Sequence, residues 1–419
     1  MRDPRLRNWM QNAALVLLTA SALFLLARLP LLQSIRLSAP PLFSAEPGGE
    51  TEDALPAAMF SSVNLMTTGD SEYGRCGRLY ISADSEALQE VIPLFQEALG
   101  SATLLGAVDD TALREALNTP GLYLELTGGP LPLEAVAAWL GEDVPFAQNV
   151  LSMALTAEGD GGASLFLLDG SGRIVRCATA LPISALQSSC EKVLPNGSYF
   201  AYETGYTTLS PYTVLTPKMV PLPDISAERP AGYSAYNLLT ALDFNAHTLS
   251  RYTETGSGAE VVEESPRTLR IAPDGSVSLI SRGTAASGLY RASGQGLKEV
   301  LAAGWRLASA LSGGTGSSPL SLRSAEAEED GWVLRFWYQV DGVPVFFSDG
   351  GDALTITFKG GAVTDFTYRC RSYTPLEEES APLLPAGMAQ AIAAAYPEAA
   401  LSIGYEDDGS GRLAAQWYR

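Results

Sequence analysis

The segment GWVLRFWYQV, residues 331–340, decides the fold class because its residues have the alternating pattern of a β-strand. Successive side chains of a β-strand point to opposite faces of a sheet, so the ten residues divide into two sets. One face carries Val333, Arg335, Trp337 and Gln339, and the other carries Leu334, Phe336, Tyr338 and Val340. One face of the sheet must be buried, and the amphipathic helix that the apolar spacing predicts over residues 295–311 supplies the cover.

The order of this unit, a helix followed by turn-separated strands, recurs on both sides of it. The first unit, 231–294, has a predicted helix over 233–242 and strands near 248–254, 259–264, 269–272 and 276–281. The second unit, 295–375, adds strands over 320–327, 343–348, 353–358 and 362–373, and a truncated unit, 376–419, has a helix over 385–396 and strands over 400–405 and 412–418. Repeated helix-then-meander order predicts an α+β fold with helices on one sheet face.

N-terminal to these units, the sequence predicts a separate domain of mixed helices and strands over residues 75–215. Strands are expected over 77–83, 121–126, 150–156, 163–168 and 173–178, and helices over 86–99, 112–117, 133–140 and 182–193. Residues 216–230 hold four prolines and form the predicted boundary between this domain and the repeated units. Residues 37–74 mix Pro, Gly, Glu and Ser at their start and are predicted to be a linker, with order beginning near Arg75.

The N-terminal residues predict a membrane anchor. No charged residue occurs from Trp9 to Ala27, and residues 9–32 would form a helix of about 36 Å, enough to cross a hydrocarbon core of about 30 Å. Arg2, Arg5 and Arg7 precede this run, so the positive-inside rule places residues 1–36 as cytoplasmic tip and anchor, and the rest outside the cell. A cleaved secretory signal is the alternative interpretation, and it would also export the chain.

Composition restricts the classes of function. The formal net charge is −20, which disfavours nucleic acid because a phosphate-binding surface needs clustered Lys and Arg. Four cysteines, Cys76, Cys177, Cys190 and Cys370, form no C-x-x-C motif, and free buried thiols are favoured over a Cys177–Cys190 disulfide. The composition and motifs therefore predict no metal or redox centre and no cofactor.

Catalytic arrangements are not favoured. His247 is the single histidine, which removes His-based triads and multi-histidine zinc sites. Ser189 and Lys192 have S-x-x-K spacing, but the partner motifs of penicilloyl-type serine enzymes do not occur. The acidic clusters, Glu326 with 328–330, 377–379 and 406–408, lie in predicted turns and lack the ligand order of a calcium loop. We expect no catalytic site.

Aromatic residues crowd the strand pair around residues 331–347. A sheet core is the ordinary explanation, since aromatic residues are favoured in strands. Phe336 and Trp337 cannot face the same side, however, so one face should be aromatic toward something other than its own helix. The candidate partner-binding residues are Trp332, Phe336, Trp337, Tyr338 and Phe346.

The repeated units resemble the extracellular regions of the YycH/YycI family. The resemblance rests on residues 237–281, and on residues 296–373 with the YQVDGVPVF hairpin and the GGAVTDF strand. Residues 391–419 are similar to a PepSY-type helix-plus-strands unit. The resemblance implies a single anchor and a large ectodomain that binds a membrane sensor histidine kinase, in a two-component system controlling cell-wall homeostasis. A paralogous anchored regulator is a second implied partner, and no catalytic residue comes with the resemblance.

Three classes of function follow. The favoured one is a membrane-anchored extracytoplasmic regulator that contacts another membrane protein. A passive cell-envelope binding module for wall polymer or peptide is the second, and an exported hydrolase is the third. The absence of a nucleophile–base pair in the sequence disfavours the hydrolase.

Overall fold

The computed structural model describes residues 55–69, 75–158, 162–205, 208–217, 221–230, 234–245, 249–281, 290–377, 383–393 and 401–418. These ranges belong to one compact unit that extends over 53–419. No helix within them is long and apolar enough to cross a bilayer. The predicted anchor, residues 9–32, lies outside the described residues.

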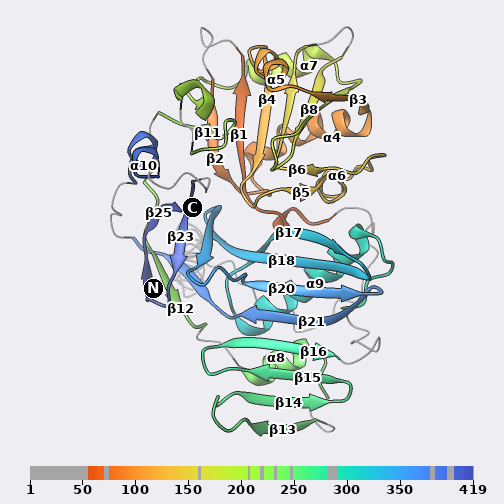
Figure 1. Cartoon of the computed structure of the whole chain (residues 1–419), viewed down its shortest axis with the longest axis vertical. Coiled ribbons are helices and arrows are strands. Elements are labelled where there is room, and N and C mark those ends of the chain that lie inside the picture. Colours follow the sequence, from red (N-terminus) through yellow and green to blue (C-terminus); the bar gives the residue numbers. More distant parts are fainter. Residues whose placement is uncertain are drawn as a thin grey trace, which may run out of the picture. The chain divides into compact units, whose positions relative to one another are not determined.

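The N-terminal part is built on a sheet whose strands, in spatial order, are β2-β1-β4-β7-β8-β9-β3 (Figure 1). Its strands are β1 (Val63–Thr68), β2 (Gly77–Ile81), β3 (Thr103–Val108), β4 (Gly121–Leu126), β7 (Ser152–Thr156), β8 (Ser164–Leu168) and β9 (Ile174–Ala178), paired antiparallel throughout. Short strands β5 (Leu131–Pro132) with β6 (Asn149–Val150), and β10 (Tyr199–Phe200) with β11 (Val214–Leu215), form two further pairs.

Both faces of this sheet are covered. On one side Leu124 and Leu165 belong to a core shared with the helices α3 (Glu86–Gln89), α4 (Ile92–Gly100), α6 (Leu133–Leu140) and α7 (Ile183–Cys190). On the other, Tyr123 and Phe166 pack with α5 (Asp110–Leu117) and with the β10–β11 segment. Every residue of β1, β4, β7 and β8 is therefore buried, whichever way its side chain points.

The predicted linker over 37–74 is wrong for residues 55–69. Residues 57–59 form a short 3-10 helix, η1 (Ala57–Met59), and β1 lies between β2 and β4 inside the sheet. Its sequence, VNLMTT, lacks the polar alternation of a half-exposed strand because both its faces are buried. The polar composition that suggested a linker belongs to the residues that precede β1.

The C-terminal part is one continuous sheet of 11 strands rather than separate units. The order is β13-β14-β15-β16-β21-β20-β18-β19-β23-β25, with β17 pairing β18 off this path. Its strands are β13 (Ser250–Thr253), β14 (Glu260–Glu264), β15 (Arg267–Ile271), β16 (Ser276–Ser281), β17 (Leu320–Glu328), β18 (Gly331–Val340), β19 (Val343–Phe347), β20 (Leu354–Lys359), β21 (Ala362–Arg369), β23 (Ser402–Asp407) and β25 (Ala415–Tyr418). The pairing of β16 with β21 joins the first two predicted units.

The predicted helix-then-strands order of these units is confirmed. Helices α8 (Ala235–Ala241) and α9 (Leu297–Thr315) precede their strands and pack together. Gly304 allows α9 to lie close to the sheet, since a Cβ there would come within 2.4 Å of the Leu334 side chain. The mixed α+β class with antiparallel sheets is thus confirmed.

The predicted proline-rich boundary contains a strand. β12 (Ile225–Glu228) pairs with β22 (Ser372–Pro375) and with β24 (Arg412–Leu413) in a small sheet. The end of the chain adds α10 (Ala386–Ala393), and β23 joins β19 in parallel. The predicted helix over 385–396 ends outside the described residues.

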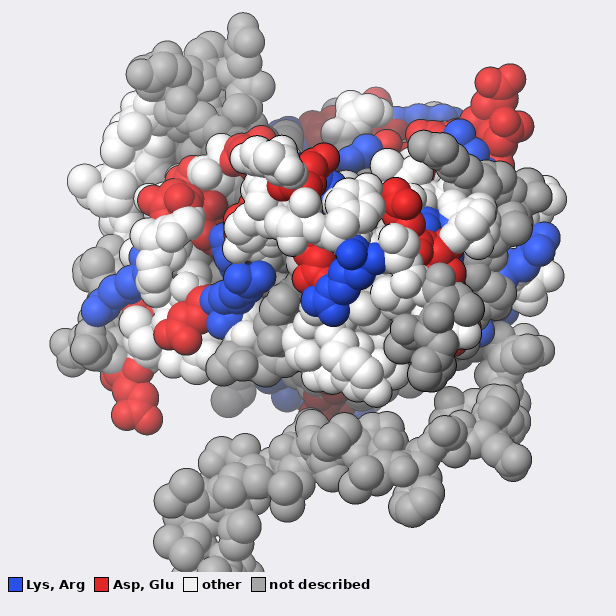
Figure 2. Space-filling model, turned by 90° about the horizontal axis from the view of Figure 1, so that it is seen from below, with Lys and Arg blue, Asp and Glu red and all other residues white. Residues whose placement is uncertain are grey.

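Charged residues of both signs are mixed on the surface near the β13 edge of the large sheet. Figure 2 shows Lys and Arg interspersed with Asp and Glu on this face. Arg251 of β13 pairs with Glu260, and Arg270 pairs with Glu254. Interspersed charges along an edge strand discourage pairing with another chain, so β13 is a protected edge.

Candidate functional site

The five predicted aromatic residues do not form one exposed patch. Phe336 and Tyr338 are completely buried, Trp337 is 4% exposed, and Trp332 and Phe346 are half-buried. Phe336 and Tyr338 belong to the core, and the Tyr338 hydroxyl donates a 2.6 Å hydrogen bond to the Arg369 carbonyl. Phe336, Trp337 and Tyr338 therefore have packing roles, and partner binding stays a prediction for Trp332 and Phe346.

Trp337 faces away from α9, as the alternation predicts, but the same chain covers it. Its Nε1–H donates to the Ser61 hydroxyl at 3.0 Å, and Ser61 in turn donates to the Leu322 carbonyl at 2.8 Å. The Phe346 ring packs edge-on against Trp337 with centroids 5.7 Å apart. The residues just before β1 therefore occupy the face that the sequence left open for a partner.

Trp332 lines a groove of about 870 Å³ between the β17–β18 hairpin and the segment that follows α6. Its walls are Pro132, Leu133, Glu134, Ala325, Glu326, Ala327, Trp332 and residues 144–149. The Trp332 Nε1–H donates to the Gln295 carbonyl at 3.3 Å, which fixes the ring at the side of the groove. The groove thus has an apolar floor and a positioned aromatic wall.

The groove is acidic and adjoins an unpaired strand edge. Glu134 and Glu326 are exposed in its walls, and no Lys or Arg is among its described lining residues, although Glu326 pairs with Arg335 of β18 at 3.4 Å. The acidic turn 328–330 continues from β17. Beyond Ser324, β17 pairs with β18 alone among the described strands. Unpaired backbone groups beside a pocket can add an extended segment as a further strand, and the acidic rim favours a segment with Lys or Arg.

A second hollow of about 660 Å³ lies over β15, β16, β21 and β20 and is strongly polar. Its arginines are paired with carboxylates: Arg270 with Glu254, Arg335 with Asp352, Arg369 with Asp349, and Arg371 with Asp407. Asp274 and Asp408 also line the hollow, so its four arginines are outnumbered by carboxylates and each of them has an acidic partner.

Asp407 corrects the expectation that residues 406–408 are solvated turn carboxylates. Asp407 ends β23 and is 4% exposed. It accepts hydrogen bonds from the Tyr373 hydroxyl at 2.7 Å and from Arg371 Nε at 3.3 Å. A buried carboxylate needs such partners to offset its lost hydration, so Asp407 is a structural group that connects β22 to β23.

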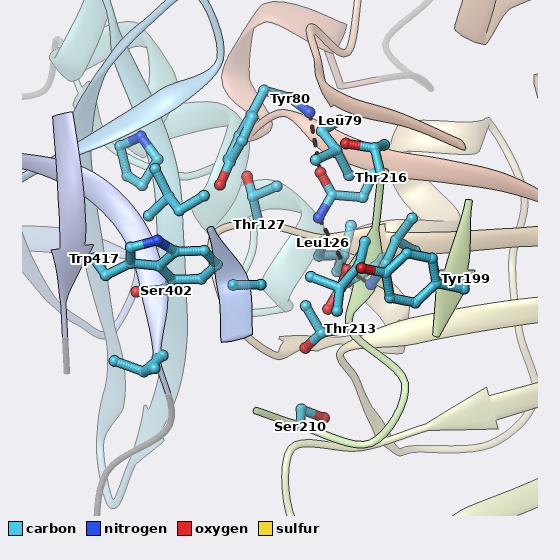
Figure 3. A pocket seen from close by; sticks show the side chains of 18 of the residues that line it. Leu79, Tyr80, Leu126, Thr127, Tyr199, Ser210, Thr213, Thr216, Ser402 and Trp417 are labelled. Carbon is cyan, nitrogen blue, oxygen red and sulfur yellow. Dashed lines mark hydrogen bonds between the residues drawn. The ribbon is translucent and has the colours of Figure 1, made fainter. Parts of the chain in front are cut away.

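The sequence analysis missed Glu125, a buried carboxyl in β4. It is 9% exposed and lines a cavity of about 420 Å³ (Figure 3). Burial raises the pKa of Glu125 to about 7, although hydrogen bonds from Asn64 and from the Val214 amide oppose the shift. The signal was present in the sequence, since Glu125 is the single charged residue of the apolar run GLYLEL.

The structure does not support the other residues that the sequence analysis considered for catalysis or metal binding. His247 lies outside the described residues. Ser189 lies in the last turn of α7 and Lys192 lies beyond the helix, exposed to solvent. The four cysteines are free thiols. Within the described ranges no three His, Cys, Asp or Glu side chains are grouped to hold a metal ion.

Comparisons with known proteins identify a common fold. Neither a protein-family model nor a curated protein sequence matches the chain. The crystal structure of YycH from Bacillus subtilis matches with a TM-score of 0.53 and 10% sequence identity, covering 87% of this chain and 94% of that one. An uncharacterized protein from Eubacterium rectale covers 47% of this chain and 75% of its own, with 13% identity and a TM-score of 0.27. The chain has a YycH-like fold over most of its length.

Proposed function

We propose that this protein is a membrane-anchored extracytoplasmic regulator that binds and modulates a sensor histidine kinase linked to cell-wall homeostasis. The observation that carries the proposal is the YycH-like fold, which extends over 87% of the chain and agrees with the resemblance in residues 237–281 and 296–373. The apolar run 9–32 supports an anchor, with the described residues outside the cell.

The groove at Trp332 is the proposed docking surface for the kinase. A half-buried tryptophan held by a hydrogen bond is a typical anchor residue of an interface, because little side-chain entropy is lost on binding. Beyond Ser324, where β17 pairs with β18 alone among the described strands, its other edge can pair with an extended kinase segment. The acidic groups Glu134 and Glu326 favour a segment that carries Lys or Arg.

Substituting groove residues is expected to weaken kinase regulation. The assay is autophosphorylation of a candidate sensor kinase reconstituted in proteoliposomes with the full-length chain. Trp332→Ala should raise the concentration for half-maximal effect by about tenfold or more, and Glu326→Lys should act in the same direction. Tyr252→Ala is the matched control, since Tyr252 is an exposed aromatic residue on β13, the opposite edge strand.

The outcome of this assay separates the candidate functions. A kinase whose activity responds to the wild type and to Tyr252→Ala, but less to Trp332→Ala, supports the proposal. An effect equal for all variants would exclude the groove as docking surface. If no membrane kinase of the same cell responded, the passive cell-envelope binding module would be the better interpretation.

Removing the anchor is expected to weaken regulation without altering the groove. Tethering confines both proteins to one membrane and raises their effective concentration, commonly to the millimolar range for short flexible tethers. A secreted form lacking residues 1–36 should therefore require about 100-fold or more higher concentration to change kinase activity. Full regulation by the released form at native abundance would contradict this role of the anchor.

A further inference from the structure

The Glu125 cavity has walls from distant parts of the chain. Asn64, Tyr80 and Glu125 come from β1, β2 and β4, and residues 210–217 contribute a second wall. The third wall comes from the start of α10, from β23 and from Trp417 of β25. Its volume of about 420 Å³ is within the range of small-molecule sites, about 300–1,000 Å³. Figure 3 shows Tyr80, Thr127 and Trp417 around the same space.

Among the described residues that line this cavity, no Lys or Arg can pair with the carboxylate of Glu125. Oε2 accepts hydrogen bonds from Asn64 Nδ2 at 2.9 Å and from the Val214 amide at 3.5 Å. These are the hydrogen bonds of this carboxylate within the described chain, and they leave Oε1 available. Glu125 is the single charged residue among those lining the cavity. The titratable groups that face it are the phenols of Tyr80 and Tyr123, whose pKa values are raised by burial and also by its charge.

The Asn64 amide connects this carboxylate to the backbone of β2. Its Oδ1 accepts a 3.0 Å hydrogen bond from the Tyr80 amide, while its Nδ2 donates to Glu125. Tyr80 lies at an irregularity in the pairing of β1 with β2 and has a φ of +56°, a conformation that is costly for a bulky residue. The strained backbone places an aromatic side chain in the cavity wall beside the carboxylate.

The remaining walls suit an organic cation, that is, a charged group carried on an apolar body. Tyr80, Tyr199 and Trp417 supply aromatic rings, and Pro217, Pro344 and Pro385 supply rigid apolar surface. Aromatic rings attract cations through their electron-rich faces, and a carboxylate attracts an ammonium group through both charge and hydrogen bonds. Among the described lining residues no Lys or Arg would offset the repulsion between Glu125 and an anion.

We propose that the Glu125 cavity binds a small organic cation, a primary ammonium group on an apolar or aromatic body, with the ammonium donating to Glu125 and the body lying against Tyr80 and Trp417. This site goes beyond the proposed kinase regulation and does not depend on it. Each proposal can therefore fail while the other holds.

Isothermal titration of the full-length chain with tyramine, at about pH 8 where Glu125 is ionised, tests the proposal. 4-Ethylphenol is the matched neutral probe, because it keeps the aromatic body and lacks the ammonium group. Tyramine should bind about tenfold or more tightly than 4-ethylphenol, and Glu125→Gln should weaken tyramine binding by about 10- to 100-fold. At about pH 5.5 the wild type should lose most of the difference between the two probes.

Two further variants locate the bound cation. Glu125 also lines a neighbouring cavity of about 510 Å³ that contains Asp110 and Asp169. Trp417→Leu alters only the proposed cavity and should weaken tyramine binding, whereas Asp169→Asn alters only the neighbouring one and should not. The reverse pattern would overturn the proposal. Equal binding of the two probes, or unchanged binding of tyramine to a folded Glu125→Gln protein, would also overturn it. So would the absence of binding at millimolar tyramine.

Discussion

Replacing Trp337 by alanine is expected to lower the free energy of unfolding by about 3–5 kcal/mol, the usual cost of removing a buried tryptophan. The side chain is 4% exposed, and its loss would leave a cavity between β18 and the residues that precede β1. The Ser61 hydroxyl would also lose its hydrogen bond from Nε1, which measures 3.0 Å. Urea denaturation at equilibrium measures the change.

Trp332→Ala is the matched control for this prediction. Trp332 lies in the same strand but is half-buried, so its removal should cost much less than that of Trp337. Ser61→Ala should cost about 1 kcal/mol, which separates the hydrogen bond from the packing. If Trp337→Ala had the stability of the wild type, this face of β18 would be exposed in solution and available to a partner, as the sequence alone suggested.

Glu125→Gln is expected to stabilise the protein at neutral and alkaline pH but not at acid pH. Burial raises the pKa of Glu125 to about 7 in the folded state, against an ordinary value of 4.5. The folded protein therefore binds this proton more tightly than the unfolded chain does. The contribution of this bound proton to the free energy of unfolding is fully present below about pH 4.5. It falls as the pH rises toward 7 and is absent above pH 7.

The size of the effect follows from the shift in pKa. Each pKa unit corresponds to 1.36 kcal/mol, so the gain from Glu125→Gln above about pH 7 should approach about 3 kcal/mol. The measurement is the difference in unfolding free energy between variant and wild type from about pH 4 to pH 8, which cancels the titration of other groups. Glu97→Gln, the same chemical change at an exposed position on α4, is the surface control. A pH-independent difference for Glu125→Gln would mean that folding leaves the pKa of this carboxyl unchanged.

Alternation predicted strands that have a core face and a more polar face, and apolar runs between turn residues predicted β4, β7 and β8, which are buried on both faces. β16 and β18 occur over the residues that the pattern predicted, because each alternates between a core face and a more polar one. β1 was missed because its sequence, VNLMTT, is neither an apolar run nor an alternating pattern, although distant elements bury both its faces. Covering elements that lie far away in the sequence leave no local pattern.

The candidate sites were harder to predict for the same reason. Trp337 lies on a face of β18 for which the sequence could not show whether the same chain or a partner covers it. Ser61, which covers it, is 276 residues away in the sequence. Glu125 gives a visible signal, a lone acid in an apolar strand, but its significance depends on Asn64 and Val214 from two other strands. The groove at Trp332 depends on residues 144–149 lying beside β17.

The pairing of β16 with β21 has a practical consequence for dissecting the protein. Fragments divided near residue 294, between the two units that the sequence indicates, would separate strands joined in register from Ser276↔Arg369 to Ile280↔Asp365. Each fragment would then expose a long strand edge whose side chains are adapted to a neighbour, which favours aggregation. Protein for crystallisation or binding work is best produced with residues 55–418 intact, and domain-swapped dimers are the expected by-product of shorter fragments.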